Sequence, residues 1–289
     1  MYRILERFVD QQQWLDAVGD PLQKFVNSVF SSRGETGKQV KNFLNGTWLA
    51  HPLHPVLTDV PVGAWTTTCV LDALSLLSGD DSLSAAADIS LATGLAGAAG
   101  SAVTGWTDWS DTYGEERKVG LLHGLTMVAA TLLYVNSLVA RRTGSRGAGM
   151  ALSAAGYGLA TAGAYLGGSQ VYDIGYGVNH TAFLHGPTEF VPVMPEADLP
   201  AGKPIKGDAK GVAVVLVRQN NQIYALDDTC VHAGCSLSGG QLRDGSIVCP
   251  CHGSRYDLRD GAVLDGPATM PEPSYEVRVQ NGVIEVKQA

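Results

Sequence analysis

The sequence CVHAGC at residues 230–235 and the sequence CPCHGS at residues 249–254 decide the interpretation of this chain. Together they hold four of its five cysteines within 22 residues, with His232 and His252 interleaved among them. Thiolates and imidazoles in two closely spaced pairs are typical of a metal site. Zinc is one candidate metal, although zinc fingers use other spacings.

The pattern Cys-x-His, sixteen residues, Cys-x2-His closely resembles the box of the Rieske family, in which each of two loops supplies one Cys and one His to a [2Fe–2S] cluster. The resemblance implies that Cys230 and Cys249 bind the inner iron. It implies that His232 and His252 bind the outer iron, near the surface. It covers about residues 187–289. A structural zinc site and plain disulfide pairs are the alternatives.

Two further cysteines, Cys235 and Cys251, are not among these four ligands. In the high-potential branch of the family, the equivalent cysteines form a disulfide between the cluster loops, and the resemblance implies the same here. Ser254 and Tyr256 stand where that branch has hydroxyls that donate to a bridging sulfide and to a ligand sulfur. Such donors stabilise the reduced cluster, so we expect a potential in the upper half of the Rieske span of about −150 to +300 mV. A free thiol pair with unrelated hydroxyls is the alternative.

Strand patterns surround the box. VAVVLVR and QIYAL flank a turn at Asn220-Asn221, and YEVRV and VIEV flank a turn at Asn281-Gly282. They predict an all-β antiparallel sandwich domain at 211–289, and Gly266-Pro267-Ala268 resembles the loop that shields the cluster in this family. Five prolines between 187 and 206 predict an extended linker at 187–210.

The part of the chain before this linker resembles a membrane protein in composition. Charged residues make up only 17% of the whole chain. Runs with almost no formal charge occupy 55–78, 89–106, 119–140 and 147–172. The last three hold no formal charge over 18 residues or more, which is the length that spans a bilayer core, and Gly163 and Gly167 have the spacing that lets helices approach closely. We therefore predict an all-α four-helix transmembrane bundle at 51–186. A soluble bundle is the alternative, but it needs charged outer faces.

The first 50 residues predict amphipathic helices, with Ile4, Phe8, Trp14 and Val18 at roughly helical spacing. Such helices lie on membrane lipid or on the bundle, and a plain soluble cap is the alternative. No short apolar core with a cleavage site is present, so a signal peptide is not expected.

The sequence HPLHP at 51–55 opens the first apolar run. It resembles a four-helix bacterial membrane domain of unknown function with an H-P-x-H-P start, which is sometimes fused to a Rieske domain. With four spans, His51, His54 and His123 fall on one membrane face, and His54 and His123 should lie close together. Histidines there can ligate haem b or a metal, or donate to a quinone. Helix capping and loop packing are the plain alternative.

The net charge and the cysteine–histidine motif together limit the possible functions. A net charge of −8 argues against nucleic acid as a partner. The leading hypothesis is a membrane-anchored electron-transfer protein whose donor is quinol or a membrane oxidoreductase. The alternative is a Rieske reductase or ferredoxin component that serves a separate oxygenase or reductase. A redox sensor that uses the disulfide as a switch is a third possibility.

The side of the membrane on which the Rieske domain lies is predicted from weaker features. Positive charges on the two faces are nearly balanced, and Arg141-Arg142 resembles a twin-arginine signal only weakly. A disulfide favours an oxidising compartment. We therefore expect a multi-pass protein of the cell membrane with its Rieske domain on the extracytoplasmic side.

Overall fold

The computed structural model describes residue 9 and residues 11–289. Its contacts divide the chain into two compact units, which are described separately. One comprises residues 1–34 and 53–174, and the other comprises residues 35–52 and 175–289. Two of the predicted apolar positions of the N-terminal segment, Ile4 and Phe8, lie outside the described residues.

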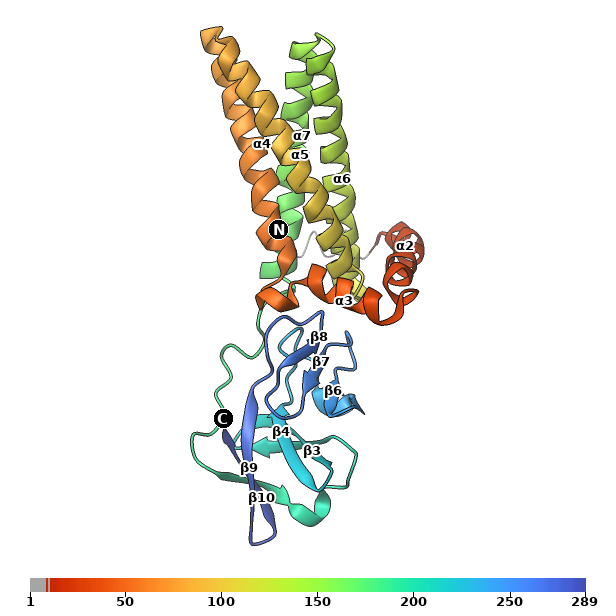
Figure 1. Cartoon of the computed structure of the whole chain (residues 1–289), viewed down its shortest axis with the longest axis vertical. Coiled ribbons are helices and arrows are strands. Elements are labelled where there is room, and N and C mark those ends of the chain that lie inside the picture. Colours follow the sequence, from red (N-terminus) through yellow and green to blue (C-terminus); the bar gives the residue numbers. More distant parts are fainter. Residues whose placement is uncertain (1–8, 10) are drawn as a thin grey trace. The chain divides into compact units, whose positions relative to one another are not determined.

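Four long helices of the first unit run alongside one another (Figure 1). They are α4 (Leu53–Ser78), α5 (Asp81–Trp109), α6 (Gly114–Arg142) and α7 (Arg146–Tyr172). Each contains one of the four predicted apolar runs. The chain reverses at Gly79 and at Gly144, where φ is +69° and +86°. Glycine adopts this left-handed conformation without strain. The predicted all-α bundle is therefore confirmed.

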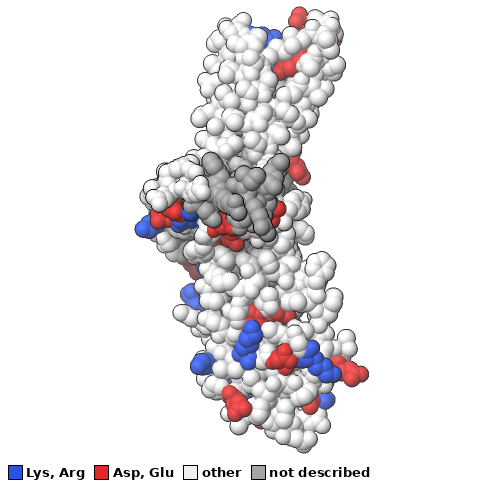
Figure 2. Space-filling view, turned by 180° about the vertical axis from the view of Figure 1, so that it is seen from behind, with Lys and Arg blue, Asp and Glu red and all other residues white. Residues whose placement is uncertain are grey.

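Three of these helices, α4, α5 and α6, combine the length and the apolar composition needed to cross a membrane, among the residues described. Helix α7 has 27 residues but is less apolar, because Gly and Ala take the place of larger side chains along it. In Figure 2 the middle of the bundle carries almost no charged side chains on the face shown. The composition and the lengths agree with membrane-spanning helices.

Charged residues inside the bundle form one ion-pair network. The Arg141 side chain is fully buried and its Nη1 donates to Asp72 at 2.8 Å and to Asp88 at 2.9 Å. Arg146 of α7 also pairs with Asp88, at 3.1 Å, so the network joins all four helices. A buried charge is tolerated when it is paired in this way. Arg141 therefore stabilises the packing of the helices.

Helix α2 (Gln13–Ser31) packs against α5 and α6. Leu15 is buried there, and Arg117 of α6 pairs with Asp16 at 2.6 Å. Trp14 and Val18 are 46% and 41% exposed. The face that packs on the bundle contains Leu15. It is therefore rotated by one residue from the apolar face with Trp14 and Val18 that the sequence suggested.

The second unit begins with α3 (Gly34–Asn45), whose residues from Glu35 onward belong to it, and the short helix η1 (Thr47–Leu49). Lys38 and Asn42 of α3 bind Asp265 at 2.6 and 3.1 Å. These contacts attach the segment to the β structure.

Two antiparallel sheets make up the rest of this unit (Figure 1), which confirms the predicted all-β fold. The larger has the order β1-β10-β9-β4-β3-β2. Its strands are β1 (Val191–Pro195), β2 (Ile205–Ala209), β3 (Val212–Gln219), β4 (Gln222–Asp227), β9 (Ser274–Gln280) and β10 (Val283–Gln288). The smaller has the order β5-β6-β7-β8, with β5 (Gln241–Arg243), β6 (Ser246–Val248), β7 (Arg255–Asp257) and β8 (Val263–Asp265). Short helices η2 (Glu196–Asp198) and η3 (Leu237–Gly239) lie between strands.

The stretch 187–210, expected to be a linker, instead contains β1 and β2. These two strands are the edges of the larger sheet. Pro192 and Pro195 lie in β1, where a missing backbone N–H is tolerated because an edge strand has a neighbour on one side only. The prolines therefore mark an edge strand and not a free connection.

Candidate functional site

Two loops carry the cysteines and histidines of the box. The first follows β4, and the second joins β6 to β7. In each loop a glycine amide donates to the carbonyl of the cysteine four residues earlier: Gly234 to Cys230 at 2.8 Å, and Gly253 to Cys249 at 3.2 Å. Both glycines have a left-handed φ, +72° and +79°. The same short turn therefore shapes both loops.

A disulfide between Cys235 and Cys251 joins the two loops, with the Cα atoms 6.4 Å apart. This confirms the disulfide that the resemblance implied. The bond leaves Cys230 and Cys249 as buried free thiols beside it.

Two buried carboxylates hold the first loop in place. Asp228 accepts from the Ser238 amide at 2.7 Å and from the Ser236 hydroxyl at 2.6 Å. Glu272 accepts from the Val231 amide at 3.0 Å, between the cysteine and the histidine of the loop. Burial raises the pKa of Glu272 to about 9. The sequence had not singled out either residue, because neither lies within the box.

At the sulfur end of the site, the hydroxyl of Tyr256 lies 3.1 Å from the sulfur of Cys230. The hydrogen bond between the two thiols raises the pKa of Cys230 and lowers the pKa of Cys249. Ser254 is fully buried and its oxygen accepts from the Ala268 amide at 3.0 Å, which ties the Gly266-Pro267-Ala268 loop to the site.

At the other end, the rings of His232 and His252 lie 4.8 Å apart. Burial lowers the pKa of His232 to about 3. His232 is only 7% exposed, because the Tyr176 ring packs 5.7 Å away and the His180 amide donates to the Val231 carbonyl. The expectation that both histidines lie near the surface is therefore wrong for His232, while His252 is half-buried.

The donor set fits a two-iron cluster. The buried Nδ1 of His232 has no hydrogen-bond partner among the described residues, and such an atom is costly unless it binds a ligand. Within the described part of the chain, no three or more His, Cys, Asp or Glu side chains surround a single ion. A [2Fe–2S] cluster does not need such a group, because each iron takes two protein ligands.

The membrane histidines separate into a pair and an outlier. The rings of His54 and His123 lie 6.3 Å apart, as the helix directions predicted. His123 is in the third turn of α6, which begins at Gly114. His51 is exposed and contacts the Leu49 carbonyl at 3.3 Å.

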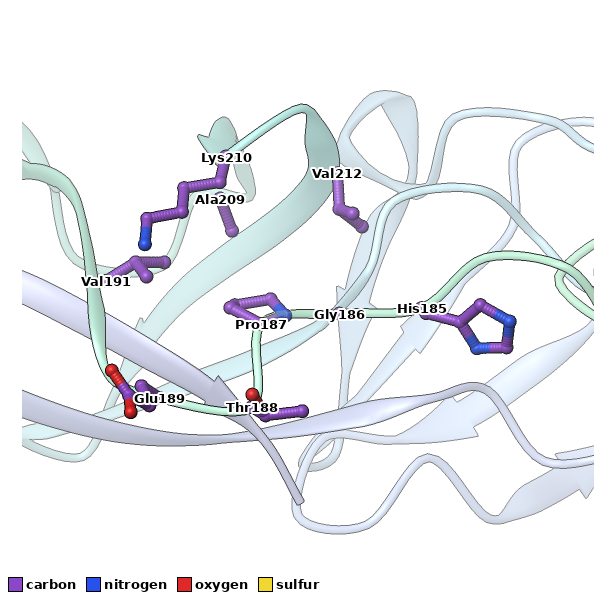
Figure 3. Close-up of a pocket in the computed structure, with 9 residues that line it drawn as sticks. All are labelled: His185, Gly186, Pro187, Thr188, Glu189, Val191, Ala209, Lys210 and Val212. Atoms are coloured by element: carbon purple, nitrogen blue, oxygen red, sulfur yellow. The ribbon is translucent and has the colours of Figure 1, made fainter.

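One cavity of about 210 Å³ lies in the second unit near the turn between β2 and β3 (Figure 3). Lys210 and Glu189 line it, and the ring of His185 at its end points away from both. None of the candidate cluster ligands lines this cavity.

Comparison with known proteins agrees with this division of the chain. Residues 189–277 match the Rieske [2Fe-2S] domain, and residues 50–180 match a predicted membrane protein family, DUF2231. The ferredoxin subunit of 3-phenylpropionate/cinnamic acid dioxygenase from Escherichia coli K12 is 37% identical over 91 residues, which are 31% of this chain and 85% of that protein. The cytochrome b6-f complex iron-sulfur subunit of Chlorobaculum tepidum is 32% identical over 97 residues, 34% of this chain and 52% of that one.

Among solved structures, the ferredoxin of carbazole 1,9a-dioxygenase from Nocardioides aromaticivorans IC177 is 32% identical, with a TM-score of 0.33 over 35% of this chain and 98% of the ferredoxin. The matched membrane family and the apolar helices indicate a membrane protein. Through its disulfide-joined loops and residues 189–277, the chain belongs to the Rieske [2Fe–2S] family.

Proposed function

We propose that Cys230 and Cys249 hold one iron of a [2Fe–2S] cluster, that His232 and His252 hold the other, and that the protein is a membrane-anchored one-electron carrier. Its electron donor is a membrane component such as quinol. The bound cluster supplies reversible one-electron chemistry. The observation that carries the proposal is the Tyr256 hydroxyl on the Cys230 sulfur, in a site closed by the Cys235–Cys251 disulfide.

The hydroxyls adjust how strongly the site holds an electron. A metal-bound thiolate has no proton, so Tyr256 must be the donor in its contact with Cys230. The Ser254 oxygen already accepts from Ala268, which leaves its proton for another acceptor, such as a cluster sulfide. Both donors favour the more negative, reduced state, and a site that accepts electrons from quinol requires this.

The imidazoles define where a donor docks. His232 is covered by the Tyr176 ring, whereas His252 is half-buried. We therefore assign electron entry to the side of His252. Imidazole can also take up or release a proton as the charge of the site changes, which suits a donor that loses protons together with electrons.

A second candidate is a ferredoxin-type component that delivers electrons to a separate oxygenase. It is favoured by the 37% identity to a dioxygenase ferredoxin subunit. The two candidates differ in the donor: quinol for the first, and a soluble reductase for the second.

The test is reduction by quinol of the full chain in lipid vesicles, followed by electron paramagnetic resonance of the reduced cluster. We expect a short-chain quinol to reduce the cluster, and a Cys249→Ser variant to give no such resonance. If dithionite reduces the cluster and quinol does not, the first candidate is wrong and the second gains support.

We also propose that the Rieske domain lies on the extracytoplasmic side, because a structural disulfide persists in an oxidising compartment. We would fuse to the C-terminus a phosphatase that is active only after export. This fusion should give an active enzyme. A fluorescent protein that folds only in the cytoplasm should remain dark in the same position. The reverse pair of results would contradict this orientation.

A further inference from the structure

We propose that His54 and His123 are the two axial ligands of one haem b inside the helical unit. This site is independent of the Rieske cluster. It rests on the way the two rings are held, on their separation and on the number of ligands available.

Backbone carbonyls determine which nitrogen of each ring carries the proton. His54 Nδ1 lies 2.9 Å from the Ser101 carbonyl of α5, and His123 Nδ1 lies 2.7 Å from the Gly163 carbonyl of α7. A carbonyl can only accept a hydrogen bond, so each Nδ1 carries the proton and each Nε2 carries a lone pair. Neither Nε2 has a hydrogen-bond partner among the described residues. This is the arrangement of a metal-binding histidine, whose other nitrogen is held by a protein acceptor.

The separation of the rings suits one metal between them. Their centroids lie 6.3 Å apart and their planes are at 85°. Two metal–nitrogen bonds of about 2.0–2.1 Å, with each nitrogen about 1 Å from its ring centre, give a separation of about 6 Å. Nearly perpendicular planes are compatible with this, because each ring binds through a single nitrogen.

The number of ligands selects haem over a bare ion. A bare zinc ion takes three or four protein ligands, and no group of three candidate ligands occurs in the described residues. Haem iron already has four porphyrin nitrogens and needs at most two ligands from the protein. A quinone is a poorer fit, because its two oxygens lie on opposite sides of a six-membered ring. Imidazoles that bound both oxygens would be farther apart than these.

Two glycines on the neighbouring helices make room for the rings. A Cβ at Gly105 of α5 would lie 2.7 Å from the His54 ring, and a Cβ at Gly167 of α7 would lie 3.3 Å from the His123 ring. Small residues permit such close approach in a membrane bundle. Polar groups inside a membrane are costly and usually functional.

The experiment uses the full chain purified in detergent from cells supplied with a haem precursor. We expect one haem b per chain by the pyridine assay, sharp α and β bands after dithionite reduction, and three irons per chain. His54→Ala and His123→Ala should each abolish the sharp bands. His51→Ala is the matched control, because this histidine is outside the pair, and it should keep the full spectrum.

A second variant separates loss of ligation from loss of folding. His54→Met should retain haem with an altered potential, because methionine can replace histidine as an axial ligand. Circular dichroism reports the helices, and the Rieske resonance reports the second unit. Wild-type protein that is helical and shows an intact Rieske resonance but binds no haem would overturn the proposal. An unchanged haem spectrum in both alanine variants would also overturn it.

Discussion

Replacing Tyr256 with Phe removes one hydroxyl from the site and leaves a fully buried ring in place. The hydroxyl lies 3.1 Å from the sulfur of Cys230 and the side chain is 0% exposed, so water does not replace it. A hydrogen bond to a charged acceptor is worth about 1.5–3 kcal/mol. Only the difference between the oxidised and reduced states changes the potential, and about 1.4 kcal/mol corresponds to 59 mV for one electron. We therefore expect the midpoint potential to fall by several tens of millivolts.

The assay is a redox titration followed by electron paramagnetic resonance on the wild type and the variant. Tyr224→Phe is the matched control. Its hydroxyl donates to Gln222 at 2.7 Å, away from the thiols, so its potential should equal that of the wild type. An unchanged midpoint in Tyr256→Phe, or equal falls in both variants, would refute the assignment of the Tyr256 hydroxyl to the cluster.

Three other predictions concern the ligands and the buried charges. The proposed ligands are Cys230, His232, Cys249 and His252. Alanine at any one of them should abolish the resonance of the reduced cluster and lower the iron content. A resonance that survives a substitution would refute that residue as a ligand. Arg141→Ala removes the hydrogen bonds of the buried Asp72 carboxylate to Arg141 and leaves it only a 3.8 Å contact with Arg146, so it should cost the bundle about 3–5 kcal/mol in thermal unfolding, whereas the exposed Arg142→Ala should cost little. Equal effects would contradict this. Burial raises the pKa of Glu272 from 4.5 to about 9, so the stability of the wild type should fall as the pH rises through this range. Glu272→Gln, which stays neutral, should not show that fall in chemical unfolding.

The sequence predicted the chemistry of the site better than its surroundings. The spacing of Cys230, His232, Cys249 and His252 sufficed for the family, because both ligand loops are short and local. It did not predict that the Tyr176 ring covers His232, because this contact joins residues far apart in the chain. Glu272 was missed for the same reason, since it meets the loop only in the folded domain.

Composition located the helices but not the details of their packing. Runs without charge marked all four long helices, and chain direction brought His54 and His123 together. Asp72 lies inside the first apolar run and Arg141 directly after the third, and nothing in their spacing shows that they pair across the bundle. Proline content suggested a linker where β1 lies, because the sequence does not distinguish an edge strand from an extended connection.

The midpoint potential of the full-length protein tests the central claim most directly. A redox titration read by electron paramagnetic resonance should show a [2Fe–2S] cluster with a midpoint well above 0 mV, in the upper half of the Rieske span of about −150 to +300 mV. That result fits a membrane-anchored carrier which accepts electrons from quinol. A midpoint near −150 mV would contradict this account.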